Sequence, residues 1–236
     1  PDGTTRYGKG EIVDTVTTDK TGLAESKPLY LGKYEIREIK APYGMVLNTD
    51  IRTAELVYAG QEIEITETSA SFYNERQKAA VSLNKVLEQN AKFGIGTNGE
   101  ISAVTFGLFA TEDLTAADGS VIPTDGLLEI LSVDENGHAV CNTDLPFGSF
   151  YLGELSTDEH YILSDEKHPI VFDYAGQDTA LVEIKANDGK PIDNDLIYGE
   201  IYGLKKDEDG NALGGAVIGL FKSDCNEFTK ENAILT

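Results

Sequence analysis

Cysteine, basic residues and long apolar runs are all scarce in this sequence, and each scarcity excludes a class of protein. Two cysteines, Cys141 and Cys225, are too few for a disulfide-stapled scaffold or a four-cysteine zinc site. No run of about 18 apolar residues is present, so we expect no direct insertion into a membrane. Only 19 lysines and arginines accompany 41 aspartates and glutamates, which gives a net charge of −22. Such a surface repels phosphate backbones and anionic lipids, which excludes nucleic acid as a partner.

What the sequence does contain is internal repetition. Three pairs of segments match: 29–48 with 145–164, 17–24 with 132–139, and 72–86 with 192–206. The first pair shares the pattern Leu, any, apolar, Gly, any, aromatic, any, apolar, any, Glu. The last pair places an asparagine eleven residues before a lysine in each copy. Repetition of this kind indicates a tandem array of similar domains.

We therefore expect three units. Residues 1–77 form the first, which lacks its opening strands, residues 78–197 form a complete domain, and residues 198–236 form the N-terminal part of a third. The chain is then a segment of a longer protein. In one further arrangement, the opening of the third unit pairs with the first unit of another chain.

Short strand-like runs separated by turn signals predict an all-β fold. The expected strands are residues 10–18, 34–38, 54–58, 63–66, 81–85, 104–109, 127–131, 150–154 and 180–184. Asp-Gly and Asn-Gly pairs, which favour tight hairpin turns, lie between many of them. No stretch of helical period competes with these strands. Many short antiparallel strands with frequent turns are typical of a β-sandwich.

Charged residues are predicted to point inward from two of these strands. Alternate residues of a strand share one face, so Glu154 lies on the same side as Phe150 and Leu152. Lys85 likewise falls on the apolar face of the 81–85 strand. An isolated buried charge is very costly, and it normally escapes by pairing or by a shifted pKa.

The first unit repeats part of this pattern. Glu38 shares a face with Tyr34 and Ile36, which marks that face as a core side. The same alternation turns Asn74 and Asn194 inward near the ends of their units. A lysine, a glutamate and an asparagine are therefore expected to converge inside one domain.

Burial of these three groups offers a reaction. Desolvation lowers the pKa of a lysine and raises that of a glutamate, so the pair can exist as a free amine and a protonated acid. The amine is a nucleophile, and the acid can hydrogen-bond to the asparagine carbonyl and relay protons. The product would be a Lys–Asn isopeptide bond with loss of ammonia. The alternatives are a buried ion pair with a hydrogen-bonded asparagine, or strand ends that reach solvent.

At these residues the sequence resembles the Cna B-type domains of Gram-positive surface proteins, also called SpaA-like or prealbumin-like domains. The resemblance is carried by the E-box LGKYEIREIKAPYG, the opening VSLNK and the closing FYN. The second copy of the E-box keeps Glu154. It has Ser-Thr-Asp-Glu-His at 156–160 where the first copy has Lys-Ala-Pro-Tyr-Gly.

The resemblance implies tandem transthyretin-like or Ig-like sandwiches stacked into an extracellular, cell-wall-attached stalk, adhesin or pilin. It implies no cofactor and no enzymatic turnover beyond a single autocatalytic step. Lys85 and Asn194 would be cross-linked, with Glu154 as the proton relay. The other units would hold incomplete sets: Glu38 and Asn74 in the first, Lys205 in the third. Neighbouring repeats of the same chain are the expected partners, together with host extracellular matrix or glycans.

Two rival functions remain open from the residues. A ligand-binding module without a cross-link, which recognises a host protein or a glycan, would use end loops such as 88–102. A conventional enzyme would need a catalytic group. His138, His160 and His168 follow no nucleophile or metal spacing, so we expect them at the surface. The acidic turn 207–211 lacks the downstream glutamate of an EF-hand, so no metal is expected there.

Overall fold

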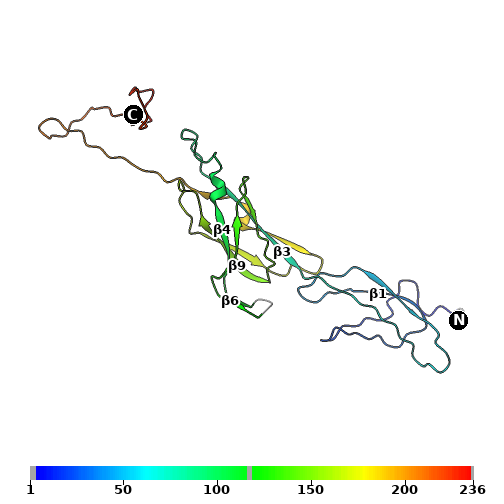
Figure 1. Cartoon of the computed structure of the whole chain (residues 1–236). Coiled ribbons are helices and arrows are strands. Elements are labelled where there is room, and N and C mark those ends of the chain that lie inside the picture. Colours follow the sequence, from blue (N-terminus) through cyan, green and yellow to red (C-terminus); the bar gives the residue numbers. More distant parts are fainter. Residues whose placement is uncertain (1–3, 116–118, 235–236) are drawn as a thin grey trace. The chain divides into compact units, whose positions relative to one another are not determined.

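A computed structural model of the protein describes residues 4–115 and 119–234 (Figure 1). Its secondary structure is almost entirely β, which confirms the all-β prediction, with two short 3-10 helices, η1 (Glu100–Ala103) and η2 (Ala186–Gly189). The chain divides into two compact units, Pro1–Leu196 and Ile197–Thr236, which we describe separately. In the described residues no helix has both the length and the apolar character that a membrane span requires.

Two four-stranded sheets form a β-sandwich within the unit Pro1–Leu196, and all of their strands follow residue 77. One sheet has the order β10-β9-β4-β7, with β4 (Thr105–Ala110), β7 (Leu127–Ser132), β9 (Gly148–Ser156) and β10 (Lys167–Phe172), all antiparallel. In the other, β3 (Lys78–Leu87) pairs in parallel with β11 (Leu181–Lys185) and β12 (Ile192–Asn194), and antiparallel with β8 (His138–Val140). A small hairpin, β5 (Leu114–Thr115) and β6 (Val121–Ile122), forms a separate two-stranded sheet, and its Leu114 packs against the core of the sandwich.

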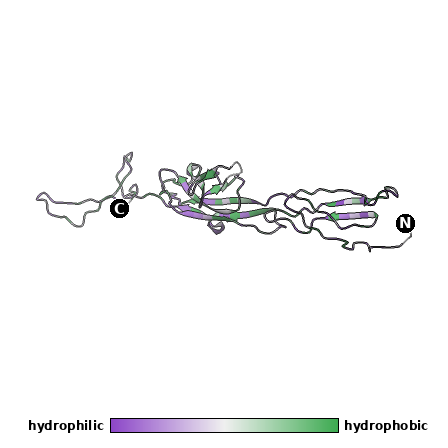
Figure 2. Ribbon diagram, turned by 90° about the horizontal axis from the view of Figure 1, so that it is seen from below, coloured by the Kyte–Doolittle hydropathy of each residue, from purple (hydrophilic) through white to green (hydrophobic). Residues whose placement is uncertain are grey.

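Alternation along the strands builds the core of the sandwich. Buried and more exposed positions alternate along the middle of β3 and β9, and the strands of the sandwich carry both hydrophobic and hydrophilic residues (Figure 2). The apolar core draws side chains from both sheets, among them Val81, Leu83, Phe106, Leu108, Phe150, Leu152, Ile170 and Phe172. Because alternate residues face the same side, Lys85 and Glu154 continue these two apolar rows and are buried with them.

The first 77 residues contain only two of the predicted strands. β1 (Gly32–Arg37) pairs antiparallel with β2 (Ile51–Leu56). The strands predicted at 10–18 and 63–66 are wrong, because these runs carry β-branched residues but form no hydrogen-bonded ladder. The predicted core face is also only partly covered: Ile36 is 37% exposed, since no second sheet packs over β1 in the described residues. The predicted division at residue 77 stays a prediction.

Residues 41–47, the loop that follows the first E-box strand, pack against one end of the sandwich. The ring centroid of Tyr43 lies 4.8 Å from that of Tyr174 and 6.0 Å from that of Phe147. Gln177 accepts two hydrogen bonds from backbone N–H groups of this loop, one at its Oε1 and one at its main-chain carbonyl, at 2.9 and 2.8 Å. The loop therefore joins the first 77 residues to the sandwich through both apolar and polar contacts.

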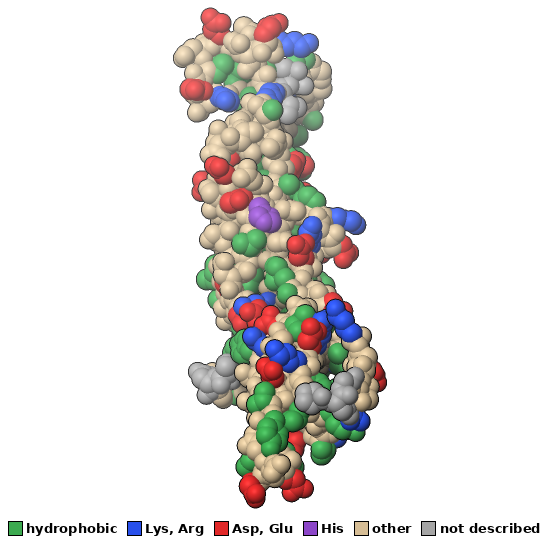
Figure 3. All heavy atoms as spheres, turned by 90° about the vertical axis from the view of Figure 1, so that its right-hand side faces the viewer, with side chains coloured by type: hydrophobic (Ala, Val, Ile, Leu, Met, Phe, Trp, Pro, Cys, Tyr) green, Lys and Arg blue, Asp and Glu red, His purple; other side chains and the backbone are tan. Residues whose placement is uncertain are grey.

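Acidic side chains are engaged locally rather than gathered into one site. On the face drawn in Figure 3, acidic and basic side chains are interspersed. In the unit 197–236, Asp207 Oδ1 accepts hydrogen bonds from Asn211 N and Asp209 N at 2.8 and 3.1 Å, which lower the pKa of Asp207. The acidic turn at 207–211 thus directs this carboxylate at its own backbone, as in an Asx turn.

Both cysteines are free, and Cys141 belongs to a carboxylate-centred loop. The Cys141 thiol donates to Glu129 at 3.0 Å, and burial together with this bond raises the pKa of Cys141 to about 12. Glu129 also accepts hydrogen bonds from the backbone N–H groups of Asn142 and Thr143. Partial burial raises the pKa of Glu129, but the hydrogen bonds from Cys141, Asn142 and Thr143 outweigh it and lower the pKa to about 2.

The Glu129 loop predicts a specific acid sensitivity. A carboxylate with a lowered pKa in the folded state stabilises the fold above its ordinary pKa of 4.5, and that contribution disappears as the pH falls to about 2. We expect Glu129→Gln to flatten the decline in the free energy of unfolding across this window, measured by urea unfolding at several pH values. Glu183→Gln, which replaces an exposed carboxylate on β11, should leave the decline unchanged. Equal slopes for Glu129→Gln and wild type would contradict the prediction.

Candidate functional site

Lys85, Glu154 and Asn194 meet inside the sandwich, each from a different strand. Lys85 comes from β3 and Asn194 from the adjacent β12, while Glu154 comes from β9 in the opposite sheet. The exposed fraction is 2% for Lys85, 3% for Asn194 and 9% for Glu154. The three groups therefore face one another across the space between the sheets, away from bulk water.

The Lys85 amine has three polar neighbours. Its Nζ donates to Asn194 Oδ1 in a short hydrogen bond and to the Ile192 carbonyl at 3.2 Å. It lies 3.7 Å from Glu154 Oε1, and both of these side chains are fully buried. Burial lowers the pKa of Lys85, while the carboxylates of Glu154 and Asp193 act in the opposite direction. Desolvation dominates, so the free amine is favoured more than in an ordinary lysine.

The two oxygens of Glu154 have different surroundings. Oε2 accepts hydrogen bonds from Asn194 Nδ2 at 2.8 Å and from Ser164 N at 2.9 Å. Oε1 is buried without a hydrogen-bond partner, and it is the oxygen that faces Lys85 Nζ at 3.7 Å. One carboxyl group thus touches the nitrogen of the amide and lies near the amine.

The Asn194 amide is held by its own hydrogen bonds. Its Nδ2 donates to Glu154 Oε2 and to the Ile162 carbonyl at 2.9 Å. The reasoning from sequence placed the glutamic acid at the amide carbonyl, but the structure differs. Glu154 lies at the nitrogen, and Lys85 occupies the carbonyl oxygen instead. The Ile162 carbonyl and Glu154 Oε2 are both hydrogen-bond acceptors, so the side of the amide that meets them is the N–H side.

Glu38 and Asn74 reproduce the acid–amide half of this site in the first 77 residues. Asn74 Nδ2 donates to Glu38 Oε2 at 2.6 Å and to the Val46 carbonyl at 2.9 Å. Glu38 Oε2 also accepts from Asn48 N at 2.7 Å. In the part of the chain that the structure describes, no lysine forms an ion pair with Glu38.

Lys205 lies in the unit 197–236 and is exposed. Its Nζ donates to the main-chain carbonyl of Lys206 at 3.1 Å. Its neighbour Lys206 forms an isolated β-bridge with Ala212. Neither observation gives Lys205 a chemical role by itself.

Backbone groups complete both sites, and sequence reasoning did not name them. Ser164 N and Ile162 O serve the second site as Asn48 N and Val46 O serve the first. The signal was present in the gapless match of 29–48 with 145–164, which pairs Asn48 with Ser164. Main-chain groups make the contacts, so the side chains at these positions are free to differ.

The histidines and the acidic residues offer no competing centre. The expectation that all three histidines lie at the surface is wrong for His168. This side chain is buried because it lies on the same face of β10 as Ile170 and Phe172, the face that packs into the core. His160 forms an ion pair with Asp158 at 2.6 Å. Across residues 4–115 and 119–234, no group of three or more His, Cys, Asp or Glu side chains is placed to hold a metal ion.

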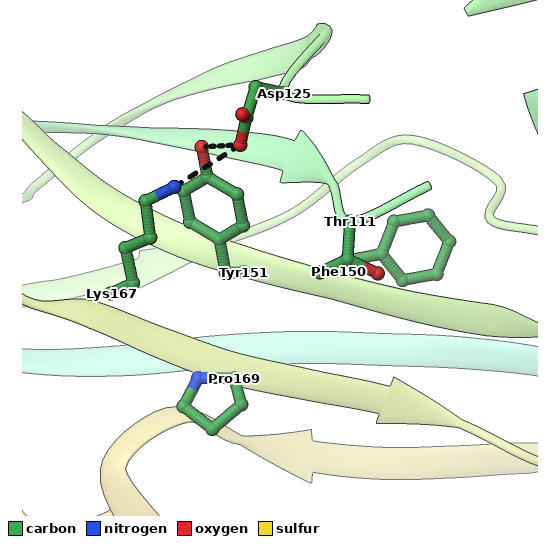
Figure 4. Close-up of a pocket in the computed structure, with 6 residues that line it drawn as sticks. All are labelled: Thr111, Asp125, Phe150, Tyr151, Lys167 and Pro169. Atoms are coloured by element: carbon green, nitrogen blue, oxygen red, sulfur yellow. Dashed lines mark hydrogen bonds and ion pairs between the residues drawn. The ribbon is translucent and has the colours of Figure 1, made fainter. Parts of the chain in front are cut away.

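A shallow recess on the outer face of the sandwich is the other feature of interest (Figure 4). Asp125 Oδ1 accepts hydrogen bonds from Tyr151 Oη at 2.8 Å and Lys167 Nζ at 3.2 Å, and the same amine lies 4.1 Å from the Tyr151 ring centroid. Phe109 stacks on Tyr151 at 5.0 Å. Asp125, Tyr151 and Lys167 therefore satisfy one another, which leaves the Tyr151 ring as the aromatic group that the recess offers to a ligand.

Comparison with known proteins finds a family match for the N-terminal part of the chain. Residues 4–70 match the family described as "SpaA: Prealbumin-like fold domain". The chain is 29% identical over 148 residues to the trypsin-resistant surface T6 protein of Streptococcus pyogenes serotype M6, and the match covers 61% of this chain and 26% of that protein. The chain thus spans about a quarter of the length of this relative.

Two solved structures illustrate the range of structural similarity. The Bacillus anthracis TIE protein has 18% identity and a TM-score of 0.48, covering 84% of this chain and 34% of that one. The Corynebacterium diphtheriae major pilin SpaA has 19% identity and a TM-score of 0.30, covering 66% of this chain and 41% of that one. The family match confirms the resemblance that the E-box indicated.

Proposed function

We propose that the chain is a structural segment of an extracellular, cell-wall-attached bacterial stalk, adhesin or pilin, because residues 4–70 match the SpaA-type, prealbumin-like family. We further infer that Lys85 and Asn194 become joined by an intramolecular isopeptide bond, with Glu154 as the proton relay. The observation that carries this inference is the buried convergence of an amine, a carboxyl group and a carboxamide. Such a protein acts on itself once and turns over no substrate.

The first step of the proposed reaction prepares the nucleophile. Lys85 transfers a proton to Glu154 Oε1, the oxygen that lies 3.7 Å from Nζ and has no hydrogen-bond partner. Desolvation favours this transfer because a neutral amine and a neutral acid replace two buried charges. The free amine can then attack the side-chain carbon of Asn194.

The second step releases the leaving group. As the Nζ–Cγ bond forms and the Cγ–Nδ2 bond breaks, the Glu154 carboxyl group turns its protonated oxygen to Nδ2, the atom that its Oε2 contacts at 2.8 Å, and gives up the proton, so that ammonia departs. Glu154 recovers a proton from Nζ, which is left as the N–H of the new amide. Lys85 and Asn194 are held in contact by the fold, and fixed proximity removes most of the entropic cost of the encounter.

The proposed bond suits a stalk. It would close a loop of 109 residues, which on the loop-entropy model developed for disulfides stabilises a fold by roughly 4–5 kcal/mol. It also joins the first strand of the sandwich, β3, to the last, β12. Tension that enters along β3 and leaves after β12 would then pass through the covalent bond and bypass most of the sandwich.

The experiment that tests the proposal is the intact mass of the purified chain under denaturing conditions. We expect a mass one ammonia below the value from the sequence. Peptide mapping should then recover one branched peptide that contains Lys85 and Asn194. A mass equal to the sequence value would overturn the cross-link and leave the triad as a polar network inside the sandwich.

The alternative function is a ligand-binding module for a host protein or a glycan. The half-buried ring of Tyr151, which lines the outer recess and stacks on Phe109, favours it, since aromatic rings are common in binding surfaces. The polar groups beside these rings are already paired with each other. The cross-link is therefore the better supported function.

A further inference from the structure

The turn between β7 and β8 lies directly beside the reactive lysine. Asp134 Oδ1 accepts hydrogen bonds from Asn136 N at 2.9 Å and His138 N at 2.8 Å. The main chain closes the same turn, with Gly137 N donating to Asp134 O at 2.9 Å. Gly137 has φ +79°, in the left-handed region that favours glycine. The aspartate and the glycine thus give the turn one defined shape.

Gly137 touches the backbone of Lys85 more closely than a side chain would allow. Lys85 N donates to the Gly137 carbonyl at 2.6 Å. A Cβ atom at position 137 would lie 2.1 Å from Lys85 O and 3.2 Å from Lys85 C. Only a hydrogen fits there. The turn is therefore in close contact with the backbone of Lys85, the residue whose side chain carries the amine.

β12 supports Lys85 from its other edge. Ile192 is the residue paired with Lys85 in the β3–β12 ladder, and its carbonyl accepts a hydrogen bond from Lys85 Nζ. Asn194 follows two residues later on the same strand. A shift of β3 away from Gly137 would thus move the amine relative to the amide it is proposed to attack.

We propose that Gly137, held by Asp134, is a positioning residue that sets where Lys85 presents its amine to Asn194. This inference rests on the proposed cross-link. Gly137 would act through its contact with the Lys85 backbone, because it has no reactive side chain. Because the reaction depends on near-contact geometry, a misplacement of about 1 Å can slow such a step by about 100-fold.

The first 77 residues contain the same turn without the lysine. Asp19 Oδ1 accepts hydrogen bonds from Thr21 N at 2.8 Å and Leu23 N at 3.2 Å, and Gly22 has φ +82°. No atom lies within 4 Å of a Cβ built on Gly22. Gly22 therefore shares the backbone strain of Gly137 but not its contact, which makes it a matched control.

The test compares Gly137→Ala with Gly22→Ala. Both full chains are made by cell-free synthesis, and ammonia loss is followed by intact mass against time, with near-ultraviolet circular dichroism as the check on folding. We expect Gly137→Ala to lower the rate constant of cross-linking at least about 10-fold, while Gly22→Ala reacts at the wild-type rate. A folded Gly137→Ala chain that reacts at the wild-type rate would overturn the inference.

A second pair of variants decides the matter if Gly137→Ala does not fold. Asp134→Ala removes the acceptor that shapes the turn without adding atoms near Lys85, and it should also slow the reaction. Asp134→Asn keeps an oxygen acceptor and should restore the rate, which a general loss of stability would not predict. Equal rates for Asp134→Ala and wild type would overturn the inference. A wild-type chain that never loses ammonia would instead overturn the proposed function.

Discussion

The Glu154→Gln variant is expected to keep the sandwich fold and to lose no ammonia on the timescale on which the wild-type chain reacts. Glutamine has the shape of glutamate and can still accept a hydrogen bond from Ser164 N, so the loop after β9 should stay in place. It cannot take a proton from Lys85 or give one to Asn194 Nδ2. Loss of a general acid–base group typically slows a reaction by about 100- to 10,000-fold, so we expect at least the lower value.

Glu38→Gln is the matched control for this variant. Glu38 makes the same contacts with an asparagine amide and a backbone N–H, but no lysine is paired with it in the described residues. The control chain should therefore show the wild-type mass and the wild-type rate. Ammonia loss from Glu154→Gln at the wild-type rate, read by intact mass, would show that Glu154 is not the proton relay.

The placement of Lys85 and Glu154 could be predicted from alternation because each lies within a regular strand. In β3 and β9 large apolar residues recur at every second position, Val81 and Leu83 in one and Phe150 and Leu152 in the other, so the inward face is defined and the next residue in phase joins it. His168 follows the same rule on β10, which sequence reasoning did not include among its strands. The burial of His168 was therefore missed because the strand itself was not predicted. The alternation rule would have placed it inward once the strand was known.

Other features depend on partners that a sequence pattern does not reveal. Residues 10–18 have strand-like composition, yet the structure gives them no ladder, because β-propensity favours a strand only when a neighbour supplies hydrogen bonds. The roles of Ser164 N and Ile162 O come from the main chain, so no residue type marks them. The direction of the Asn194 amide is set by the Ile162 carbonyl, and only coordinates show which end of the amide meets Glu154.

Gln77 is a buried polar residue whose loss should weaken the protein without touching the proposed cross-link. It is fully buried just before β3. Its Nε2 donates to Thr179 O at 2.6 Å and to Gly176 O at 3.0 Å, and its Oε1 accepts from Ala175 N at 2.8 Å. The side chain thus satisfies three backbone groups of the loop between β10 and β11, and the same loop receives residues 41–47 through Gln177.

We expect Gln77→Ala to lower the free energy of unfolding by about 2 kcal/mol, since it removes a buried side chain together with three hydrogen bonds whose net contribution is about 0.5–1.5 kcal/mol each and whose backbone partners lie in a partly exposed loop. The measurement is urea unfolding in the Glu154→Gln background, where no cross-link obscures the equilibrium. Gln77→Leu keeps most of the side-chain volume, so a similar loss would assign the effect to the hydrogen bonds and not to a cavity. Gln61→Ala, at an exposed position, should change the free energy of unfolding by less than about 0.5 kcal/mol. A loss below about 1 kcal/mol for both Gln77 variants would mean that the backbone groups of this loop find other hydrogen-bond partners, and it would contradict the prediction.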